Sequence, residues 1–148
     1  MPSAVDLLVA RGIPAEAVES ALGVMVRTDA ARTQDAVAVL WEVGCDFFVD
    51  LFGTDTGEGV ELTYHVRELA TRSDLYLRCL VPYDGEIASV WRTYPAALYP
   101  EREAAELLGL TLSGHPNPKR LLTTEELGPM LRRDRAVRSA GEVQLPYE

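Results

Sequence analysis

Residues 46–81 read DFFVDLFGTDTGEGVELTYHVRELATRSDLYLRCLV and contain three runs with the composition of β-strands, at 46–53, 60–66 and 74–81. Two short polar connectors, TDTGEG and RELATRS, separate these runs, which favours an antiparallel meander. In the third run apolar residues alternate with more polar ones, so one face of the meander is expected to pack on helices. The stretch therefore predicts a sheet whose helical cover comes from elsewhere in the chain.

The residues before the meander predict part of that cover and one more strand. Residues 5–10 and 15–23 place apolar side chains at three- and four-residue spacings, which is typical of two short helices. Residues 24–29, VMVRTD, predict a strand. Residues 31–44 predict a helix that ends at Gly44.

After the meander the apolar residues return to helical spacing. Pro82 ends the third run, and residues 87–110 are predicted to be helical, interrupted at Pro95 and restarted at Pro100. Gly109 is expected to close the second of these helices, because glycine readily adopts the conformation that ends a helix.

The predicted fold class is α+β. Residues 1–112 are expected to form one domain, with a mostly antiparallel sheet of about four strands and helices packed on one face. Residues 113–148 contain no long periodic run, and we expect them to form an extended C-terminal docking tail that gains order on binding.

Length and composition agree with a globular domain. A chain of 148 residues fits a single domain, and a domain of this size buries roughly 68–70% of its unfolded surface. The chain has no run near the ~18 consecutive apolar residues of a membrane span, and its N-terminal residues lack a basic region before an apolar core. We therefore expect a cytoplasmic chain without a span. Cys45 and Cys79 are expected to be buried thiols.

Charge is distributed unevenly along the chain. The net charge of −9 argues against nonspecific nucleic-acid binding, which needs a basic surface. Residues 1–112 hold 8 Lys and Arg against 18 Asp and Glu, whereas residues 113–138 hold 6 against 3. The basic end of the chain is therefore expected to face either the acidic surface of its own body or a partner.

Three carboxylates near residue 100 have a structural and a catalytic interpretation. Glu101 and Glu103 fall in the first turn of a predicted helix, where the helix dipole favours carboxylates, and Arg102 stands four residues before Glu106 on the expected exposed side. A paired acid and base is the alternative, but the sequence indicates no pocket for it. A third possibility is that Arg102 forms an ion pair buried at an interface.

The histidines and tryptophans have structural explanations as well. His115 is a candidate general base or metal ligand, yet no nucleophile or second ligand lies at a useful spacing. Between a glycine and a proline, it is expected to sit in a turn with a ring nitrogen bonded to a backbone carbonyl. His65 is expected to be hydrogen-bonded within a strand. Trp41 and Trp91 are expected to be core or interface anchors.

Four basic residues of the tail, Lys119, Arg120, Arg132 and Arg133, have three interpretations. They form a solvated basic face, dock on an acidic partner or bind nucleic acid. The tail lacks interleaved aromatic residues, which weighs against single-stranded nucleic acid. The charge asymmetry favours docking.

A series of short motifs resembles a known family in its order. The series runs Glu101-Arg102-Glu103, Gly109-Leu110, Gly114-His115-Pro116, Lys119-Arg120-Leu121-Leu122 and Leu131-Arg132-Arg133-Asp134. Upstream of it stand FVDLFGTD at 48–55, Tyr64-His65, Trp91 and Pro95. Over about residues 24–138 this order is similar to the 30 kDa subunit, also called the C subunit, of NADH:quinone oxidoreductase (respiratory complex I).

The resemblance implies a non-catalytic structural subunit in the peripheral arm of a membrane-associated oxidoreductase, on the cytoplasmic side. Such a subunit packs on the large catalytic subunit near its quinone or nickel-iron site. It binds no cofactor itself, and iron-sulfur clusters lie in neighbouring subunits. Related subunits occur in group 4 membrane-bound hydrogenases and formate hydrogenlyases, so the parent complex is open between these and the NADH-oxidising enzyme.

The resemblance also implies where the partner binds. The residues expected at that interface are Glu101, Arg102, Glu103, Gly114, His115, Pro116, Lys119, Arg120, Arg132, Arg133 and Asp134. A free-standing regulatory or small-molecule-binding protein is the alternative from another class, and it would need a pocket of convergent polar groups.

Overall fold

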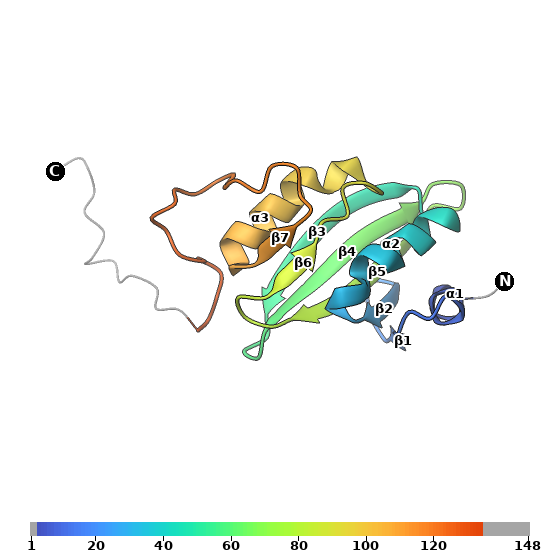
Figure 1. Ribbon diagram of the computed structural model, residues 1–148. Coiled ribbons are helices and arrows are strands. Elements are labelled where there is room, and N and C mark those ends of the chain that lie inside the picture. The colour runs from blue at the N-terminus through green and yellow to red at the C-terminus, as the bar shows by residue number, and fades with distance from the viewer. Residues whose placement is uncertain (1–2, 135–148) are drawn as a thin grey trace.

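The computed structural model describes residues 3–134 and confirms the α+β class (Figure 1). The elements are α1 (Ala4–Ala10), β1 (Ala15–Val18), β2 (Val24–Thr28), the 3₁₀ turn η1 (Ala30–Arg32), α2 (Thr33–Glu42), β3 (Phe47–Asp55), β4 (Val60–Glu68), β5 (Ser73–Val81), β6 (Glu86–Ala88), η2 (Pro95–Ala97), α3 (Leu98–Leu108) and β7 (Thr111–Ser113).

The main sheet has five strands in the order β1-β2-β5-β4-β3. β3, β4 and β5 form the predicted antiparallel meander, whose pairing is irregular only between Phe48 and Asp50 of the edge strand β3. β2 pairs with β5 in parallel. This arises because α2 carries the chain from β2 to the far edge, where β3 begins. The sheet is thus mostly antiparallel as predicted, with β1 as an additional strand.

β1 corrects one prediction, because residues 15–23 are not a helix. Ala15–Val18 pair antiparallel with β2, and a turn closes the hairpin. The Thr28 hydroxyl donates to the Pro14 carbonyl (2.7 Å) at the start of β1. An isolated helix shorter than about 12 residues is marginal in water, whereas the edge of β2 offers backbone hydrogen bonds to an extended chain.

Residues 86–94 correct a second prediction, because they form β6 and a turn instead of a helix. Ile87, Val90 and Tyr94 are spaced as on a helix, and all three are buried. The Tyr94 amide donates to the Val90 carbonyl (2.9 Å), which makes a single helix-like turn. β6 itself pairs with β7 in a parallel two-stranded sheet. Apolar spacing alone could not separate these arrangements.

α3 begins at Leu98, two residues before the predicted start at Pro100. Pro100 is tolerated there because amides of the first helical turn have no acceptor within the helix. Gly109 ends the helix as predicted, in the left-handed conformation (φ +71°). Its amide donates to the Ala105 carbonyl (2.8 Å).

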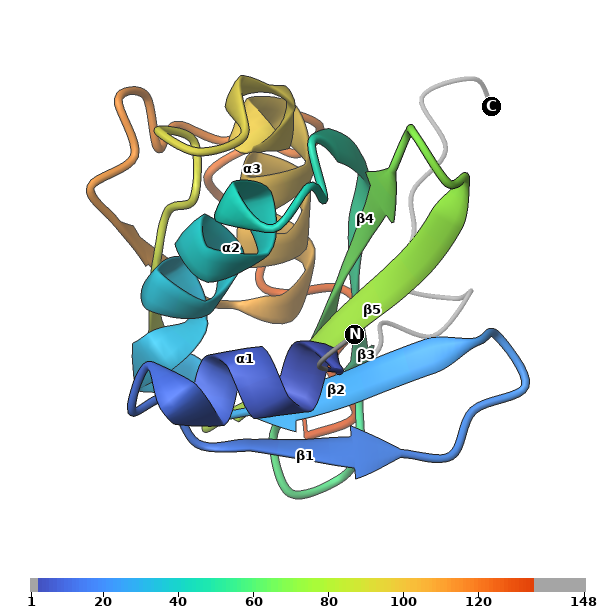
Figure 2. The same cartoon turned by 90° about the vertical axis from the view of Figure 1, so that its right-hand side faces the viewer.

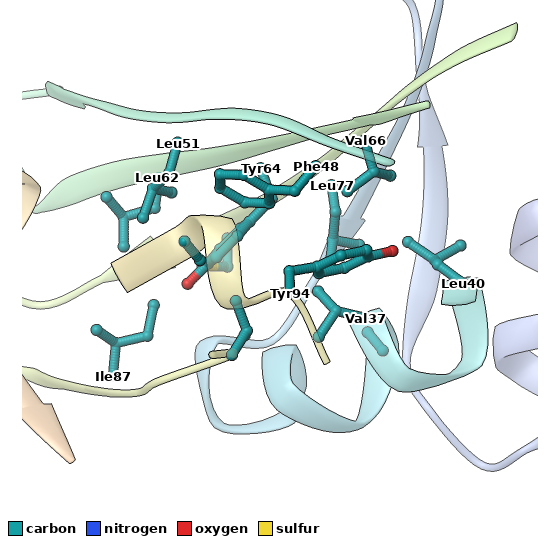
Figure 3. Packing of buried hydrophobic residues seen from close by; sticks show 14 of the residues in the cluster. Val37, Leu40, Phe48, Leu51, Leu62, Tyr64, Val66, Leu77, Ile87 and Tyr94 are labelled. Carbon is teal, nitrogen blue, oxygen red and sulfur yellow. The ribbon is translucent and has the colours of Figure 1, made fainter. Parts of the chain in front are cut away.

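The helices lie on one side of the main sheet, and the core lies between the two layers (Figure 2). Buried side chains of α2 meet those of β4 and β5 around the ring of Tyr94 (Figure 3). The Tyr94 hydroxyl donates to the Cys45 carbonyl (2.6 Å), and Trp41 packs edge-on against the ring (5.6 Å between centroids). Cys45 and Cys79 are buried free thiols, as predicted.

On the strands β4 and β5, polar side chains form a hydrogen-bonded cluster. His65 Nε2 lies 2.8 Å from Asp74, and its ring stacks on Tyr76. Asp74 also accepts two hydrogen bonds from Arg67 (2.8 and 3.0 Å). The Arg67 guanidinium and then His65 lower the pKa of Asp74 to about 2. His65 is therefore hydrogen-bonded within its strand pair, as predicted.

Gly53 of β3 sets how closely α3 approaches the sheet. A Cβ atom at this position would collide with Cδ1 of Leu108 on α3 and would lie 3.0 Å from Cδ2 of Leu62. Both leucines are fully buried, so neither has room to retreat. The close packing of α3 therefore depends on a residue without a side chain.

Substituting Gly53→Ala is expected to lower the free energy of unfolding by about 1–3 kcal/mol, the usual cost of overpacking a core. Urea unfolding measures this cost, with exposed Thr54→Ala as the control. In a Leu108→Ala background, where the colliding methyl group is gone, the added cost of Gly53→Ala should shrink. An unchanged cost would show that Gly53 does not accommodate α3.

Candidate functional site: α3 and the segment it holds

Residues 114–134, called here the C-terminal segment, run beside α3 and contain no helix or strand (Figure 1). β7 spans the predicted domain boundary at residue 112. The tail was expected to become ordered on a partner; in the structure, contacts within the chain hold residues 114–134. The rest of the predicted tail, residues 135–148, lies outside the described residues.

The first of these contacts is the turn around His115. The Nε2 atom of His115 lies 2.9 Å from the Leu98 carbonyl, and Nδ1 accepts from the Asn117 amide (3.0 Å). Because Nδ1 accepts, Nε2 carries the proton and donates. This confirms the predicted turn with a ring nitrogen on a backbone carbonyl. Trp91 Nε1 donates to the Gly114 carbonyl (2.9 Å), which fastens the same turn.

Glu101 lies in the first turn of α3, as predicted, and it is buried beneath the turn around His115. It accepts from the Ser89 hydroxyl (2.5 Å) and the Val90 amide (2.7 Å), and His115 Nε2 lies 3.8 Å from it. Burial raises the pKa of Glu101, although these donors partly oppose the shift.

This meeting of serine, glutamate and histidine does not have the geometry of a catalytic triad. In a triad the histidine lies between the acid and the serine and takes the serine proton. Here the Ser89 hydroxyl donates directly to Glu101, and His115 donates to a carbonyl. All three side chains are buried, so a substrate has no access. The arrangement holds the segment.

Arg102 and Glu106, one turn apart on α3, hold the backbone of residues 119–123. Arg102 donates to two consecutive carbonyls, those of Lys119 (2.6 Å) and Arg120 (2.9 Å). Glu106 accepts from three consecutive amides, those of Leu121, Leu122 and Thr123. The prediction that Arg102 and Glu106 pair with each other on the exposed side of the helix is therefore wrong. Each side chain instead forms hydrogen bonds with backbone groups of the segment.

Two opposing effects set the pKa of Glu106. Burial acts to raise it, but the amides of residues 121–123 outweigh burial and hold the pKa of Glu106 below its usual value. The carboxylate form is thus the form that binds the segment.

Arg132 anchors the far end of the segment. Its side chain is 1% exposed, and its guanidinium pairs with Asp134 and with Asp84 (2.7 Å). The guanidinium carbon lies 4.4 Å from the ring centre of Tyr83. Hydrogen bonding first to Asp134 and also to Asp84 raises the pKa of Arg132 above its already high value. This basic residue therefore binds the chain's own body.

Asp55, the last residue of β3, adds a contact next to this anchor. Its carboxylate accepts from the Arg133 amide (2.5 Å), the Gly57 amide (2.8 Å) and the Tyr83 hydroxyl. The hydrogen bond from Tyr83 lowers the pKa of Asp55 against the effect of burial, and the amides lower it further. The same bond raises the pKa of Tyr83.

The residues predicted for the interface divide into two sets. Those that contact other parts of the chain are Glu101, Arg102, Gly114, His115, Arg120, Arg132 and Asp134. The others are Glu103, Pro116, Lys119 and Arg133, whose side chains are exposed; of these, Lys119 and Arg133 contact the described part of the chain only through their backbone. Asp55, Tyr83, Asp84 and Ser89 belong to the site but were not predicted for it from the sequence. Asp55 ends the motif FVDLFGTD, so the resemblance included it without assigning it a contact. Tyr83 and Asp84 lie in PYDGE, which predicts only a turn, and no local pattern marks Ser89.

Several large apolar side chains of the segment are exposed. Leu122 is 64% exposed, and Met130 and Leu131 are each 56% exposed. Glu125 and Glu126 of the segment and Tyr99 on α3 are exposed as well. Exposed apolar surface rimmed by polar residues is typical of a protein interaction site. Among residues 3–134, no helix is long and apolar enough to span a bilayer, and no cluster of three His, Cys, Asp or Glu is arranged to hold a metal ion.

Sequence comparison gives a consistent result. A family described as the respiratory-chain NADH dehydrogenase 30 kDa subunit matches residues 26–140. The C subunit of NADH-quinone oxidoreductase from Rhodobacter capsulatus is 32% identical over 143 residues, which cover 92% of this chain and 70% of the relative. The C subunit from Moorella thermoacetica is 31% identical over 102 residues, covering 66% of this chain and 69% of the relative.

Two solved structures share the fold. A trypsin-resistant fragment of Nqo5 (residues 1–134 of that protein) has a TM-score of 0.63 at 24% identity, over 74% of this chain and 92% of the fragment. A chain of the archaeal membrane-bound sulfane sulfur reductase has a TM-score of 0.73 at 21% identity, over 88% of this chain and 82% of that one.

Substituting Glu106→Gln is expected to release residues 121–123 from α3. A neutral amide keeps one acceptor oxygen but turns donors toward backbone amides, and hydrogen bonds to a charged group contribute about 1.5–3 kcal/mol. Hydrogen exchange of these amides should therefore quicken by at least about tenfold, while exchange in β4 and β5 stays unchanged. Glu103→Gln, on the exposed side of α3, is the control. Equal exchange in both variants would contradict the role of Glu106.

The attachment of the segment should also depend on pH. Glu106 and Asp55 have folded-state pKa values below their usual ones, so they stabilise the attached state above the ordinary carboxyl range and lose this effect as pH falls through the folded values. Glu101 has a raised pKa and acts in the opposite direction. Limited proteolysis should cut the segment faster at about pH 3 than at pH 7, after correction for protease activity. Equal resistance at both pH values would contradict this.

Proposed function

Because this chain belongs to the family of the respiratory-chain NADH dehydrogenase 30 kDa subunit, we propose that it is a non-catalytic subunit of the peripheral arm of a membrane-associated oxidoreductase. It packs on the large catalytic subunit of that complex through the C-terminal segment and α3. The electron carriers, iron-sulfur clusters, belong to neighbouring subunits. The complex-bound chain lies on the cytoplasmic side of the membrane.

The single observation that carries the proposal is the set of exposed apolar side chains on a segment that is already fastened. Leu122, Met130 and Leu131 are exposed, while the amides of residues 121–123 are bound to Glu106 of α3 and the amide of Arg133 is bound to Asp55 of β3. Exposed apolar side chains gain free energy when a partner covers them. A fixed backbone also reduces the ordering cost that binding would otherwise carry.

The surface around these apolar residues has the composition of an interface. Tyr99 is exposed on α3, and the guanidinium carbon of Arg102 lies 5.8 Å from the centre of its ring. Lys119 and Arg133 are exposed on the segment. Aromatic and arginine side chains are enriched at protein interfaces. The same surface suits a partner in an NADH-oxidising complex or in a hydrogenase-like one, so the proposal covers both.

Point substitutions test the proposed docking surface better than deletion of the C-terminal segment does. Removing everything after Ser113 would take away His115 and Arg132. It would also leave Glu106 without its three bound amides and Asp55 without the amide of Arg133. A truncated chain would then fail for reasons of stability, because unpaired buried polar groups are costly. Exposed apolar residues can be changed without this effect.

Substituting Leu131→Asp is expected to reduce incorporation into the complex by at least about tenfold, because the partner would bury an unpaired charge. Leu22→Asp, at a 57% exposed leucine in the β1–β2 hairpin, is the matched control and should assemble normally. Native electrophoresis of membranes from the host cell, with the chain tagged, measures incorporation. Equal thermal unfolding of the two variants would exclude a folding defect. Normal assembly of Leu131→Asp would contradict the proposed surface.

A further inference from the structure

A small cavity lies between α3 and the C-terminal segment, with a volume of about 210 Å³. Ala105 and Leu110 line it from the α3 side, and Pro118 and Pro129 line it from the segment. Sites for cofactors and drug-sized ligands occupy about 300–1,000 Å³. This cavity is smaller, and it holds roughly seven times the ~30 Å³ that a water molecule occupies in the liquid. It is large enough to admit a side chain and small for a cofactor.

The cavity also carries a local excess of positive charge. Arg102, Lys119 and Arg120 line it, against the single carboxylate of Glu106. The chain as a whole has a net charge of −9, so the local excess is opposite in sign to the net charge of the molecule. Glu106 offsets only part of the excess, because it brings one negative charge against three positive ones, and three backbone amides hold it in place.

Within the described part of the chain, the hydrogen bonds of the two arginines go to neutral groups. Arg102 donates to backbone carbonyls, and Arg120 donates to the Thr123 hydroxyl and the Thr124 carbonyl. Within residues 3–134, neither arginine nor Lys119 takes part in an ion pair. Carbonyl dipoles orient the guanidinium groups but carry no net negative charge. A carboxylate entering the cavity would therefore be attracted.

We infer that this cavity receives one acidic side chain, an Asp or a Glu, from the large catalytic subunit. The methylene stem lies against Ala105 and the two prolines, and the carboxylate meets Lys119 and Arg120 at the rim. This inference rests on the proposed function, and it adds the chemistry of one contact to it. This contact would fix how the two proteins are aligned, because a charged pair is favourable in only one position. Apolar residues such as Leu131 add buried area to the interface but do not specify its alignment.

The test measures binding of the purified large subunit to the intact chain by titration calorimetry at about 50 and 500 mM salt. Lys119→Glu reverses an exposed charge that has no hydrogen bond to lose within residues 3–134, and it is expected to weaken binding by at least about tenfold at low salt. Arg72→Glu, in the connection between β4 and β5 away from the segment, is the charge-matched control (Figure 1). Arg72 is exposed and, within residues 3–134, takes part in no ion pair, so this change should leave the affinity unchanged.

A second variant tests shape without changing charge. Ala105→Leu fills part of the cavity and should weaken binding by a similar factor at both salt concentrations, provided that hydrogen exchange of residues 121–123 is unaltered. If the large subunit binds the unmodified chain and both variants equally well, the cavity is not an acidic-residue site, although the proposed function stands. If it does not bind the unmodified chain, the proposed function fails, and the inference fails with it.

Discussion

The backbone of residues 114–134 is in no helix or strand, so where it packs against the body its N–H and C=O groups need partners from other parts of the chain. α3 supplies these partners with two side chains of opposite charge, one turn apart. Arg102 takes the carbonyls of residues 119 and 120, and Glu106 takes the amides of residues 121–123. The position of the segment therefore follows the position of α3, which in turn follows the small size of Gly53 on β3. A packing constraint in the core is in this way transmitted to the surface that exposes the apolar side chains.

The uneven charge of the chain has two uses, and the structure separates them. Arg132 binds Asp84 on the body and Asp134 within the segment, so part of the basic excess is neutralised inside the chain. Lys119 and Arg133 are exposed, and their charge is available to a partner. The sequence analysis left open whether the basic end faces its own body or another protein. Both interpretations hold, each for different residues. Arg132 binds within the chain and fixes the segment, and the segment then holds Lys119 and Arg133 where a partner can reach them.

What could be predicted from the sequence was the local part of the fold. The meander of residues 46–81 follows from its composition and short connectors, and Gly109 ends α3 because few other residues adopt the left-handed conformation. β1 could not be predicted from residues 15–18 alone. Their extended conformation depends on pairing with the edge of β2. The same limit applied to the site. Asp55 contacts the amide of Arg133, 78 residues further along the chain, and a local pattern carries no information about such a partner.

The segment is held within the chain before any partner arrives, and this changes how binding free energy is used. Fixing the backbone of one residue costs about 1–2 kcal/mol, so a disordered segment would spend much of its contact free energy on becoming ordered. Here the hydrogen bonds of Glu106, Asp55 and His115 order the segment during folding, before a partner binds. The exposed Leu122 and Leu131 can then contribute their burial mainly to affinity. Weakening the internal contacts should therefore slow or weaken assembly even where every exposed residue is intact, because the same surface would have to be ordered in the act of binding.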